Sequence, residues 1–509
     1  MSLLTIYHQI PKRYILSILG FFGMLTASIL RSNLSIAIVA MTTPTLEKSS
    51  INTTTILAAD YNWSSTTQGY ILSSFFYSYC AFQIPAGFLA TIFGGRILFG
   101  GSIGLCALLT LLTPVCARSG PGTLIYLRIL EGLCSSCVYP SLYAVWSKWA
   151  PKNNKSALVT VSFSGAYFGT FIIMLLGGVI AADWSWEWIF YLSGISALVW
   201  AVVWFPATIE SPATRQNILV EEVLYIEEGM GKTISQKDAV PWKDILTSLP
   251  VWSITAAQFG TNWAIYAIFS ELPTFLVESL DFPVDTAGLL AALPWLLLAI
   301  SVYLTGIISD KLVEKYHTLY VRKLIMAISF TLIASSFLLI TLLDASNRVL
   351  IVMGVIIVMG ACGPAWASSG VNQLDIAGRY VAVLMGISNS IGSTPGFLAP
   401  MITGYIVENP HLKREWNIIF IISIVICVLA LGCYLCCAAG ELQAWALNNN
   451  DEYEPMLDYP ISSRDITLGC YLCCAAGELQ AWALNNNDEY EPMLDYPISS
   501  RDISERSFE

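Results

Sequence analysis

Long apolar runs separated by short polar loops make up most of this chain. An α-helix rises about 1.5 Å per residue, so about 20 residues cross the roughly 30 Å hydrocarbon core of a bilayer. Twelve runs reach this length, at residues 14–41, 67–90, 97–117, 123–146, 157–181, 187–206, 249–275, 286–309, 323–343, 348–369, 380–406 and 416–437. The pattern predicts an all-α polytopic membrane protein with 12 transmembrane helices.

One longer polar stretch divides the runs into two sets of six. We therefore expect an N-terminal six-helix half at residues 1–206, a cytosolic linker at 207–248, a C-terminal six-helix half at 249–437 and a cytosolic tail at 438–509. A weak internal repeat supports two halves, because AGFLATIFGGR follows the second run and TGIISDKLVEKY follows the eighth. Two related halves around a cavity near the middle of the membrane are typical of secondary transporters.

The basic residues of the loops predict the orientation. If the N-terminus is cytosolic, fifteen Lys and Arg residues fall in cytosolic loops and five on the opposite side. Cytosolic loops are enriched in basic residues, so both termini are expected to be cytosolic. The first loop then faces the lumen or the exterior, where its sequons at Asn52 and Asn62 are predicted glycosylation sites.

Composition agrees with a membrane protein and excludes several other classes. The chain is 55% hydrophobic and 12% charged, whereas soluble proteins carry about 25% charged residues. The net charge of −11 comes from the tail, because residues 438–509 hold 14 acidic and 3 basic residues. The acidity therefore indicates no partner, and no nucleic acid is expected. Most of the 13 cysteines lie in apolar runs, which does not suggest a disulfide framework.

The tail contains a perfect tandem duplication. Residues 431–466 recur without a change at residues 468–503. The apolar start of the second copy is too short to cross a bilayer. Identity this complete indicates a recent duplication, and we assign it no function. Residues 452–457 (EYEPML) resemble an acidic dileucine-type sorting signal, which would make sorting adaptors partners of the tail.

One charge lies deep in the first run. Arg31 is about 25 Å along the helix axis from Tyr14. An arginine at this depth costs on the order of 3 kcal/mol on insertion scales, so it is expected to face a water-filled cavity or a protein partner. A guanidinium binds carboxylate or phosphate in bidentate fashion and stays ionised. We therefore favour substrate binding by Arg31; the alternative is an ion pair that holds helices together.

Several strings resemble a known transporter family: RSNLSIAIVAM, GYILSSFFYSYCAFQIPAGFLA, RILEGLCSSCVYPSLYAVWSKWAPKNNKS, NQLDIAGRY and GELQAWAL. They are similar to the anion/cation symporters of the major facilitator superfamily. That family includes sialin, the vesicular glutamate transporters and the sodium–phosphate cotransporters, and the likeness is strongest to sialin. The resemblance covers about residues 14–447. It implies an alternating-access carrier of anions driven by protons, membrane potential or sodium.

The fourth run contains a second charged cluster. Arg128 and Glu131 are three residues apart and therefore lie on one face of a helix. The resemblance makes Glu131 a candidate for proton coupling, with Arg128 modulating its protonation. The alternative is a permanent ion pair that keeps this helix inserted.

Four positions depart from the family pattern. Ser135 replaces a second glutamate, Tyr143 and Gln373 replace histidines, and Thr261 replaces the second arginine of the glutamate carriers. One cavity arginine suits a monocarboxylate, such as a sialic or other sugar acid, better than a dicarboxylate. A histidine relay is excluded because the three histidines lie outside the runs: His8, His317 and His411.

Polar residues in the second, fourth, seventh and eleventh runs are further candidates for substrate binding: Tyr70, Tyr143, Asn262, Tyr266 and Asn389. For all of them except Tyr143, a hydrogen bond between helices is favoured over a contact with the substrate. Asp375 and Arg379, at the end of the tenth run, are predicted to form a gate.

We therefore expect a secondary active transporter of organic anions of the sialic acid, sugar acid or acidic amino acid type, coupled to H⁺, with Na⁺ as the alternative coupling ion. It is expected to be a monomer without cofactor or metal, in a lysosomal or vesicular membrane. The alternative within the family is a plasma-membrane, sodium-dependent phosphate or urate cotransporter. A membrane-embedded enzyme is disfavoured, because the runs contain no histidine for a catalytic constellation.

Overall fold

The computed structural model describes residues 11–42, 45–48, 54–57, 60–212, 218–230, 239–269, 272, 275–280, 282, 284–344, 346–407 and 411–447. These described residues all belong to one compact unit. Most described residues are helical, because a backbone in hydrocarbon must satisfy its own hydrogen bonds.

The first six predicted spans correspond to seven helices: α2 (Lys12–Thr42), α3 (Ser65–Phe93), α4 (Gly95–Ser119), α5 (Pro121–Ser136), α6 (Val138–Trp149), α7 (Lys155–Asp183) and α8 (Trp186–Ala207). A short 3₁₀ turn, η1 (Lys152–Asn154), precedes α7. Between α2 and α3, strands β1 (Thr45–Lys48) and β2 (Thr54–Leu57) pair antiparallel, with Thr45 opposite Leu57.

The linker contributes α9 (Val220–Met230) and α10 (Trp242–Thr247). The remaining spans correspond to α11 (Leu249–Phe269), α13 (Val284–Val313), α14 (Thr318–Leu342), α15 (Arg348–Ala377), α16 (Val381–Gly392), α17 (Pro395–Ile406) and α18 (Lys413–Cys437). Short turns complete the described part: η3 (Phe275–Ser279), η4 (Gly378–Tyr380) and η5 (Ala444–Ala446).

The prediction of an all-α membrane protein is confirmed. Among the described residues, nine helical stretches are long and apolar enough to cross a membrane, and the stretch Arg348–Ile406 contains two of the predicted runs. The fourth and eleventh spans are broken, into α5 and α6 and into α16 and α17. Proline explains both breaks, because Pro140 and Pro395 lack the N–H that would continue the helix.

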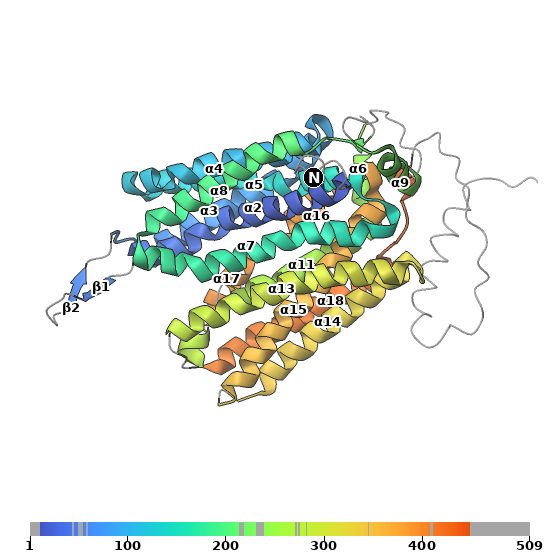
Figure 1. Ribbon diagram of the computed structural model, residues 1–509. Coiled ribbons are helices and arrows are strands. Elements are labelled where there is room, and N and C mark those ends of the chain that lie inside the picture. Colours follow the sequence, from blue (N-terminus) through green and yellow to red (C-terminus); the bar gives the residue numbers. More distant parts are fainter. Residues whose placement is uncertain are drawn as a thin grey trace, which may run out of the picture. The chain divides into compact units, whose positions relative to one another are not determined.

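The two ends of the helix bundle are distinct (Figure 1). One end holds the β1–β2 hairpin, and we name it the hairpin end. The other holds α9, and we name it the α9 end. The carboxylate of Glu222 on α9 accepts hydrogen bonds from the backbone nitrogens of Lys12 (2.8 Å) and Arg13 (3.0 Å). The linker is thereby anchored to the start of α2.

Glycines bring α2 and α7 into close contact. On α7, Gly165 and Gly169 lie against the backbone oxygens of Phe21 and Leu25, where a Cβ would clash. Small residues four apart let membrane helices approach at backbone distance. This contact sets the position of α2, which carries Arg31.

The linker does not separate two independent bodies. α7 packs against α13, and α3 packs against α16. Each contact contains a glycine of the internal repeat: Gly87 against the backbone oxygen of Ala382, and Gly306 against the hydroxyl of Thr160. The division into halves at residues 207–248 stays a prediction.

Candidate functional site

A cavity lies beside α2. Its lining comes from α2, α3, α5, α6 and α7: Met24, Ala27, Ser28, Arg31, Tyr79, Ser135, Val138, Tyr139 and Ala166. Most of these side chains are apolar or carry a hydroxyl group. Arg31 is the charged residue among them.

The guanidinium of Arg31 has no ion pair and no hydrogen-bond acceptor among the residues that the structure describes. It is partly exposed to the cavity. Four tyrosine side chains lie within electrostatic range: Tyr79, Tyr139, Tyr167 and Tyr266. Neutral hydroxyl groups do not balance the charge of an arginine, which stays protonated. The cavity therefore has the chemistry to bind an anion.

Glu131 and Arg128 form a buried ion pair beside this cavity. The Arg128 Nη1 atom lies 2.6 Å from Glu131 Oε2, and both side chains are almost completely buried. The hydroxyl of Thr110 on α4 donates to the other carboxylate oxygen over 3.1 Å. The ring of Phe75 lies below the guanidinium at 4.8 Å. Both charges therefore have compensating partners, as burial requires.

The pair also contacts the helix that carries Arg31. Arg128 Nη2 donates to the backbone oxygen of Arg31 over 3.2 Å. One guanidinium thus connects the Glu131 carboxylate to the backbone of the arginine that lines the cavity. A shift of α2 relative to α5 would change this contact.

Two predicted ligand residues instead bridge helices. Asn389 Nδ2 donates to the hydroxyl of Tyr79 over 3.0 Å, and Asn262 Nδ2 donates to the backbone oxygen of Gly392 over 2.6 Å. For both asparagines the structure therefore favours the alternative of a hydrogen bond between helices. Asn389 still adjoins the cavity through Tyr79.

The three predicted tyrosines have different surroundings. Tyr266 is buried, lies within electrostatic range of Arg31 and contacts the ring of Phe76. Tyr143 is fully buried against the ring of Phe163, outside the cavity lining. It does not line the cavity in this structure, and its role in substrate binding stays a prediction.

Tyr70 does not line this cavity either, and its role in substrate binding also stays a prediction. Its side chain is 61% exposed. Tyr79 follows nine positions later on α3 and faces the cavity. At about 100° per residue, nine positions place the two side chains on opposite faces of the helix.

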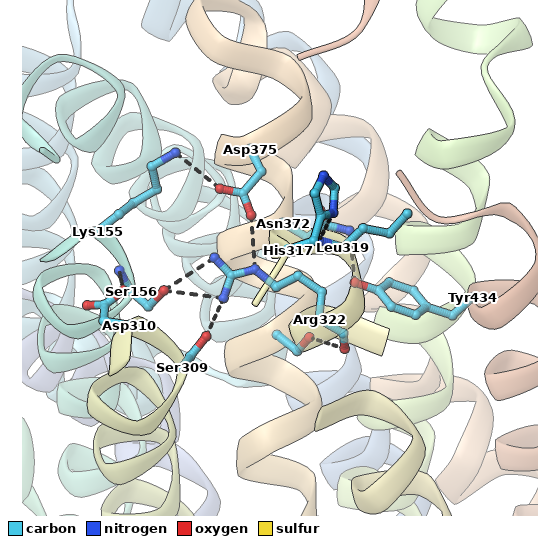
Figure 2. A network of polar contacts seen from close by, with 11 residues as sticks. Lys155, Ser156, Ser309, Asp310, His317, Leu319, Arg322, Asn372, Asp375 and Tyr434 are labelled. Carbon is cyan, nitrogen blue, oxygen red and sulfur yellow. Dashed lines mark hydrogen bonds and ion pairs between the residues drawn. The ribbon is translucent and has the colours of Figure 1, made fainter. Parts of the chain in front are cut away.

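Charged and polar side chains form a network at the α9 end (Figure 2). The carboxylate of Asp375 on α15 lies 2.9 Å from Arg322 Nε and 3.1 Å from Lys155 Nζ. Arg322 also donates to the hydroxyls of Ser156 (3.2 Å) and Ser309 (2.6 Å). Since Lys155 and Ser156 belong to α7, and Arg322 to α14, the network joins helices from both sides of the linker.

Asp310 strengthens the same junction. Its carboxylate accepts hydrogen bonds from the backbone nitrogens of Ser156 (2.9 Å) and Ala157 (2.7 Å) at the start of α7. A carboxylate is favoured at a helix N-terminus, where backbone N–H groups have no partner within the helix. Asp310 on α13 therefore holds the start of α7 from across the linker.

The gate predicted at Asp375 and Arg379 stays a prediction. Asp375 does lie at an interface between helices, but the ion-pair partners that the structure shows come from α14 and α7. The guanidinium of Arg379 lies 4.8 Å from the ring centre of Tyr380. Arg322 had the appearance of a loop charge in the sequence, yet it is buried within α14. The sequence does not show this burial, because the partner Asp375 lies 53 positions later in the chain and only the fold brings it beside Arg322.

The remaining predicted sites lie near or beyond the described residues. Asn62 is exposed at the hairpin end, just before α3. Asn52, the sorting-signal-like segment at residues 452–457 and the second copy of the duplication lie outside the described residues.

Sequence reasoning missed three tyrosines near Arg31, namely Tyr79, Tyr139 and Tyr167. The sequence feature that could have identified them is a tyrosine within an apolar run. Tyr70 and Tyr143 have the same feature. That signal does not separate tyrosines that face the cavity from the others, because the span hydropathy has little helical periodicity.

Comparison with known proteins decides the family. The model of the Major Facilitator Superfamily matches residues 16–321. The chain belongs to the major facilitator superfamily. Sialin from Homo sapiens is 35% identical over 462 residues, which cover 86% of this chain and 91% of sialin. Vesicular glutamate transporter 2 from Homo sapiens is 34% identical over 452 residues, 86% of this chain and 76% of that protein.

A third relative, vesicular glutamate transporter 3 from Danio rerio, is 33% identical over 481 residues, 90% of this chain and 81% of that protein. The resemblance seen in the sequence motifs is therefore confirmed. The protein is a multi-pass membrane transporter and not an enzyme. Similar identity to sialin and to the glutamate transporters does not by itself select a substrate.

Proposed function

We propose that this protein is an alternating-access symporter of organic monoanions, with Arg31 as the residue that binds the substrate carboxylate. The observation that carries the proposal is the Arg31 guanidinium, which faces the cavity without an ion pair among the described residues. A bidentate carboxylate would supply the missing charge and two charge-assisted hydrogen bonds. The names of the relatives, sialin and vesicular glutamate transporters, agree with an organic anion.

The cavity chemistry favours a sugar acid over a dicarboxylate. It offers one cation, and the surrounding polar groups are mainly hydroxyls, including Ser28 and Tyr139. The position of a second arginine in the glutamate carriers is Thr261, whose hydroxyl donates to the backbone oxygen of Ala257. A second carboxylate would find no matching cation among the cavity-lining residues. Hydroxyl groups of a sugar would find donors and acceptors.

Proton coupling is assigned to Glu131. Its partner Arg128 also holds the backbone oxygen of Arg31, so substrate binding and the Glu131 carboxylate share one intermediary. Movement of α2 on substrate binding would change the Arg128 contacts and with them the stability of the charged carboxylate. Coupling to Na⁺ is the alternative, together with a phosphate or urate substrate.

Alternating access requires each end to close in turn. In this structure the α9 end is joined by the Asp375 network and by Asp310. Nearer the middle of the bundle, α3 and α17 meet through aromatic rings, with those of Tyr77 and Phe397 5.6 Å apart. The stronger junction supports a state in which the α9 end is closed. Loss of the ion pairs would then open that end.

The expected membrane is lysosomal or vesicular, with both termini in the cytosol. The excess of basic loop residues at the α9 end supports this orientation. The hairpin end would face the lumen, so substrate and protons would leave the lumen together. Plasma-membrane localisation is the alternative.

Uptake into proteoliposomes tests the proposal. We expect an inward proton gradient to drive accumulation of radiolabelled N-acetylneuraminate or glucuronate in the absence of sodium. Replacing the proton gradient by an inward sodium gradient should not support uptake. Absence of gradient-driven flux for both sugar acids, for glutamate and for phosphate would contradict the proposed function. Sodium-dependent phosphate flux would favour the alternative.

A further inference from the structure

Three buried glutamines from three helices lie around one part of α16. They are Gln83 of α3, Gln258 of α11 and Gln373 of α15, and none is more than 3% exposed. We name these three residues the polar collar. Glutamine is seldom fully buried, because its amide needs several hydrogen-bond partners.

Each member contacts the segment of α16 at residues 385–388. The backbone oxygen of Gln83 lies where a Cβ on Gly386 would clash. Gln258 Nε2 lies 3.9 Å from the sulfur of Met385. The hydroxyl of Ser388 donates to Gln373 Oε1 over 3.4 Å. The last two contacts are long or involve sulfur, so they satisfy the amides poorly.

Every member also has an amide atom without a hydrogen-bond partner among the described residues. These atoms are Oε1 and Nε2 of Gln83, Oε1 of Gln258 and Nε2 of Gln373. Nearly all buried polar groups in proteins are paired, and leaving one unpaired costs free energy. A methionine of similar length would fill the same space without this cost. Packing in the closed conformation therefore does not explain three glutamines.

The polar collar lies between the cavity and the closed end. Tyr79 lines the cavity and accepts the hydrogen bond from Asn389. Gln83 follows one helical turn after Tyr79 on α3, and the collar contact at Met385 lies one turn from Asn389 on α16. One further turn along α3, Gly87 touches the backbone of Ala382.

α16 is suited to move as a short unit. Its span is interrupted after Gly392, and α17 starts at Pro395. A helix break lets one half of a span tilt without moving the other. Opening of the α9 end has to separate α16 from α3, because their backbones touch at Gly87. This separation would uncover the polar collar.

We propose that the polar collar is a second binding station, for water and for the oxygen atoms of the transported solute, on the route from the Arg31 cavity to the α9 end. The unpaired N–H groups of Gln83 and Gln373 donate to carboxylate or hydroxyl oxygens. The unpaired carbonyl oxygens of Gln83 and Gln258 accept from hydroxyls or water. When the α9 end is closed, these atoms have no hydrogen-bond partner among the described residues, which destabilises the closed state. The polar collar therefore also favours opening of the α9 end.

The proposal for the polar collar rests on the proposed alternating-access transport, but it does not depend on which anion or coupling ion is transported. Its tests therefore use stability and solvent access, and their failure is distinguishable from failure of the proposed flux.

Thermal stability shows whether Gln83 has an unpaired amide or instead stabilises the packing of the closed state. If its amide is unpaired in the closed state, Gln83→Met should raise the melting temperature of the purified protein by about 1–2 °C. The matched control is Gln68→Met on the same helix, because Gln68 Nε2 donates to the backbone oxygen of Trp63 over 3.0 Å. The control should leave the melting temperature unchanged or lower it. A lower melting temperature for Gln83→Met would overturn the proposal.

Cysteine accessibility tests the route itself. Gln83→Cys and Gln373→Cys are treated with a membrane-impermeant methanethiosulfonate from the α9 side, and modification is read by mass spectrometry. Asp375→Asn removes the carboxylate that pairs with Lys155 and Arg322 and so weakens the junction at the α9 end. When each cysteine variant also carries Asp375→Asn, we expect its modification to rise several-fold. Ser329→Cys is equally buried, on the contact of α14 with α15, and should stay unmodified.

A positive control at the closure completes the design. Ser309→Cys reports whether Asp375→Asn opens the α9 end, since Ser309 accepts from Arg322 in the network. Modification of Ser309→Cys without modification at either collar position would overturn the proposal. Modification of both collar positions, with Ser329→Cys protected, would support it.

Discussion

The guanidinium of Arg128 lies 2.6 Å from the carboxylate of Glu131, and both groups are buried. The same guanidinium reaches the backbone of Arg31. The residue proposed to bind substrate and the residue proposed to carry a proton are thereby joined by one side chain. The following predictions test this connection and the helix contacts that support it.

Arg31→Ala should abolish substrate binding while the protein stays folded. The Arg31 side chain has no ion pair among the described residues, so its removal leaves no buried charge without a partner. Two lost hydrogen bonds to a charged group, at about 1.5–3 kcal/mol each, correspond to an affinity at least about 100-fold lower. Binding and melting temperature are measured on the same purified sample, with Arg31→Lys as the charge-preserving control. Normal transport by Arg31→Ala would refute the central role of this residue.

Glu131→Gln should eliminate proton-driven uptake while exchange of substrate across the membrane continues. Glutamine keeps the size and a hydrogen-bond acceptor but cannot release a proton at neutral pH. Uptake with and without a proton gradient, measured between pH 5 and 8, is the readout. An unchanged pH dependence would exclude Glu131 as the coupling residue.

The double variant Arg128→Met/Glu131→Met distinguishes coupling from a structural ion pair. Removing one partner of a buried pair costs about 3–5 kcal/mol, whereas replacing both by apolar residues is often neutral. We expect Arg128→Met alone to be unstable and the double variant to be stable but uncoupled. Gradient-driven uptake by a stable double variant would show that the pair has only a structural role.

Arg322→Gln should destabilise the α9 end more than Arg379→Gln. Arg322 contacts Asp375 and two serine hydroxyls, and its loss leaves a buried carboxylate with Lys155 as its remaining ion-pair partner in the described network. The expected cost approaches the roughly 3–5 kcal/mol of a broken buried pair. Thermal unfolding of the two variants provides the comparison. A larger loss of thermal stability for Arg379→Gln than for Arg322→Gln would support the gate predicted from the sequence at Asp375 and Arg379.

Gly165→Val should prevent stable association of α2 with α7. Its side chain would meet the backbone oxygen of Phe21, which cannot move without displacing α2. Gly178→Val is a matched control on the same helix, because a Cβ there meets nothing within 4 Å. We expect folded yield to fall for the first variant only. Equal yields would mean that this contact does not position α2.

Much of the fold was predictable from the chain. Membrane spans have a length set by the bilayer, so the twelve apolar runs anticipate the helices from α2 to α18 closely. Arg31 was identifiable as a candidate site residue for a related reason, since a charge at this depth has few explanations other than function. Glu131 and Arg128 followed from their spacing on one helix face.

Contacts between helices were not predictable in the same way. Lys155, Asp310 and Arg322 resembled ordinary loop charges, and only the packing of α7 against α13 and α14 against α15 brought them together. The tyrosines near Arg31 and the polar collar had no distinguishing pattern, because nearly every position of a membrane span is apolar and little periodicity remains.

The apolar runs of the chain were sufficient to establish the all-α membrane class, the approximate places of the spans, the depth of Arg31 and the likeness to anion transporters, because the bilayer imposes length and polarity on each span separately. Only the tertiary structure decided which polar side chains face the cavity, which close the α9 end and which remain buried without partners. Those properties depend on the rotation and contact of each helix against its neighbours. No single span encodes that information.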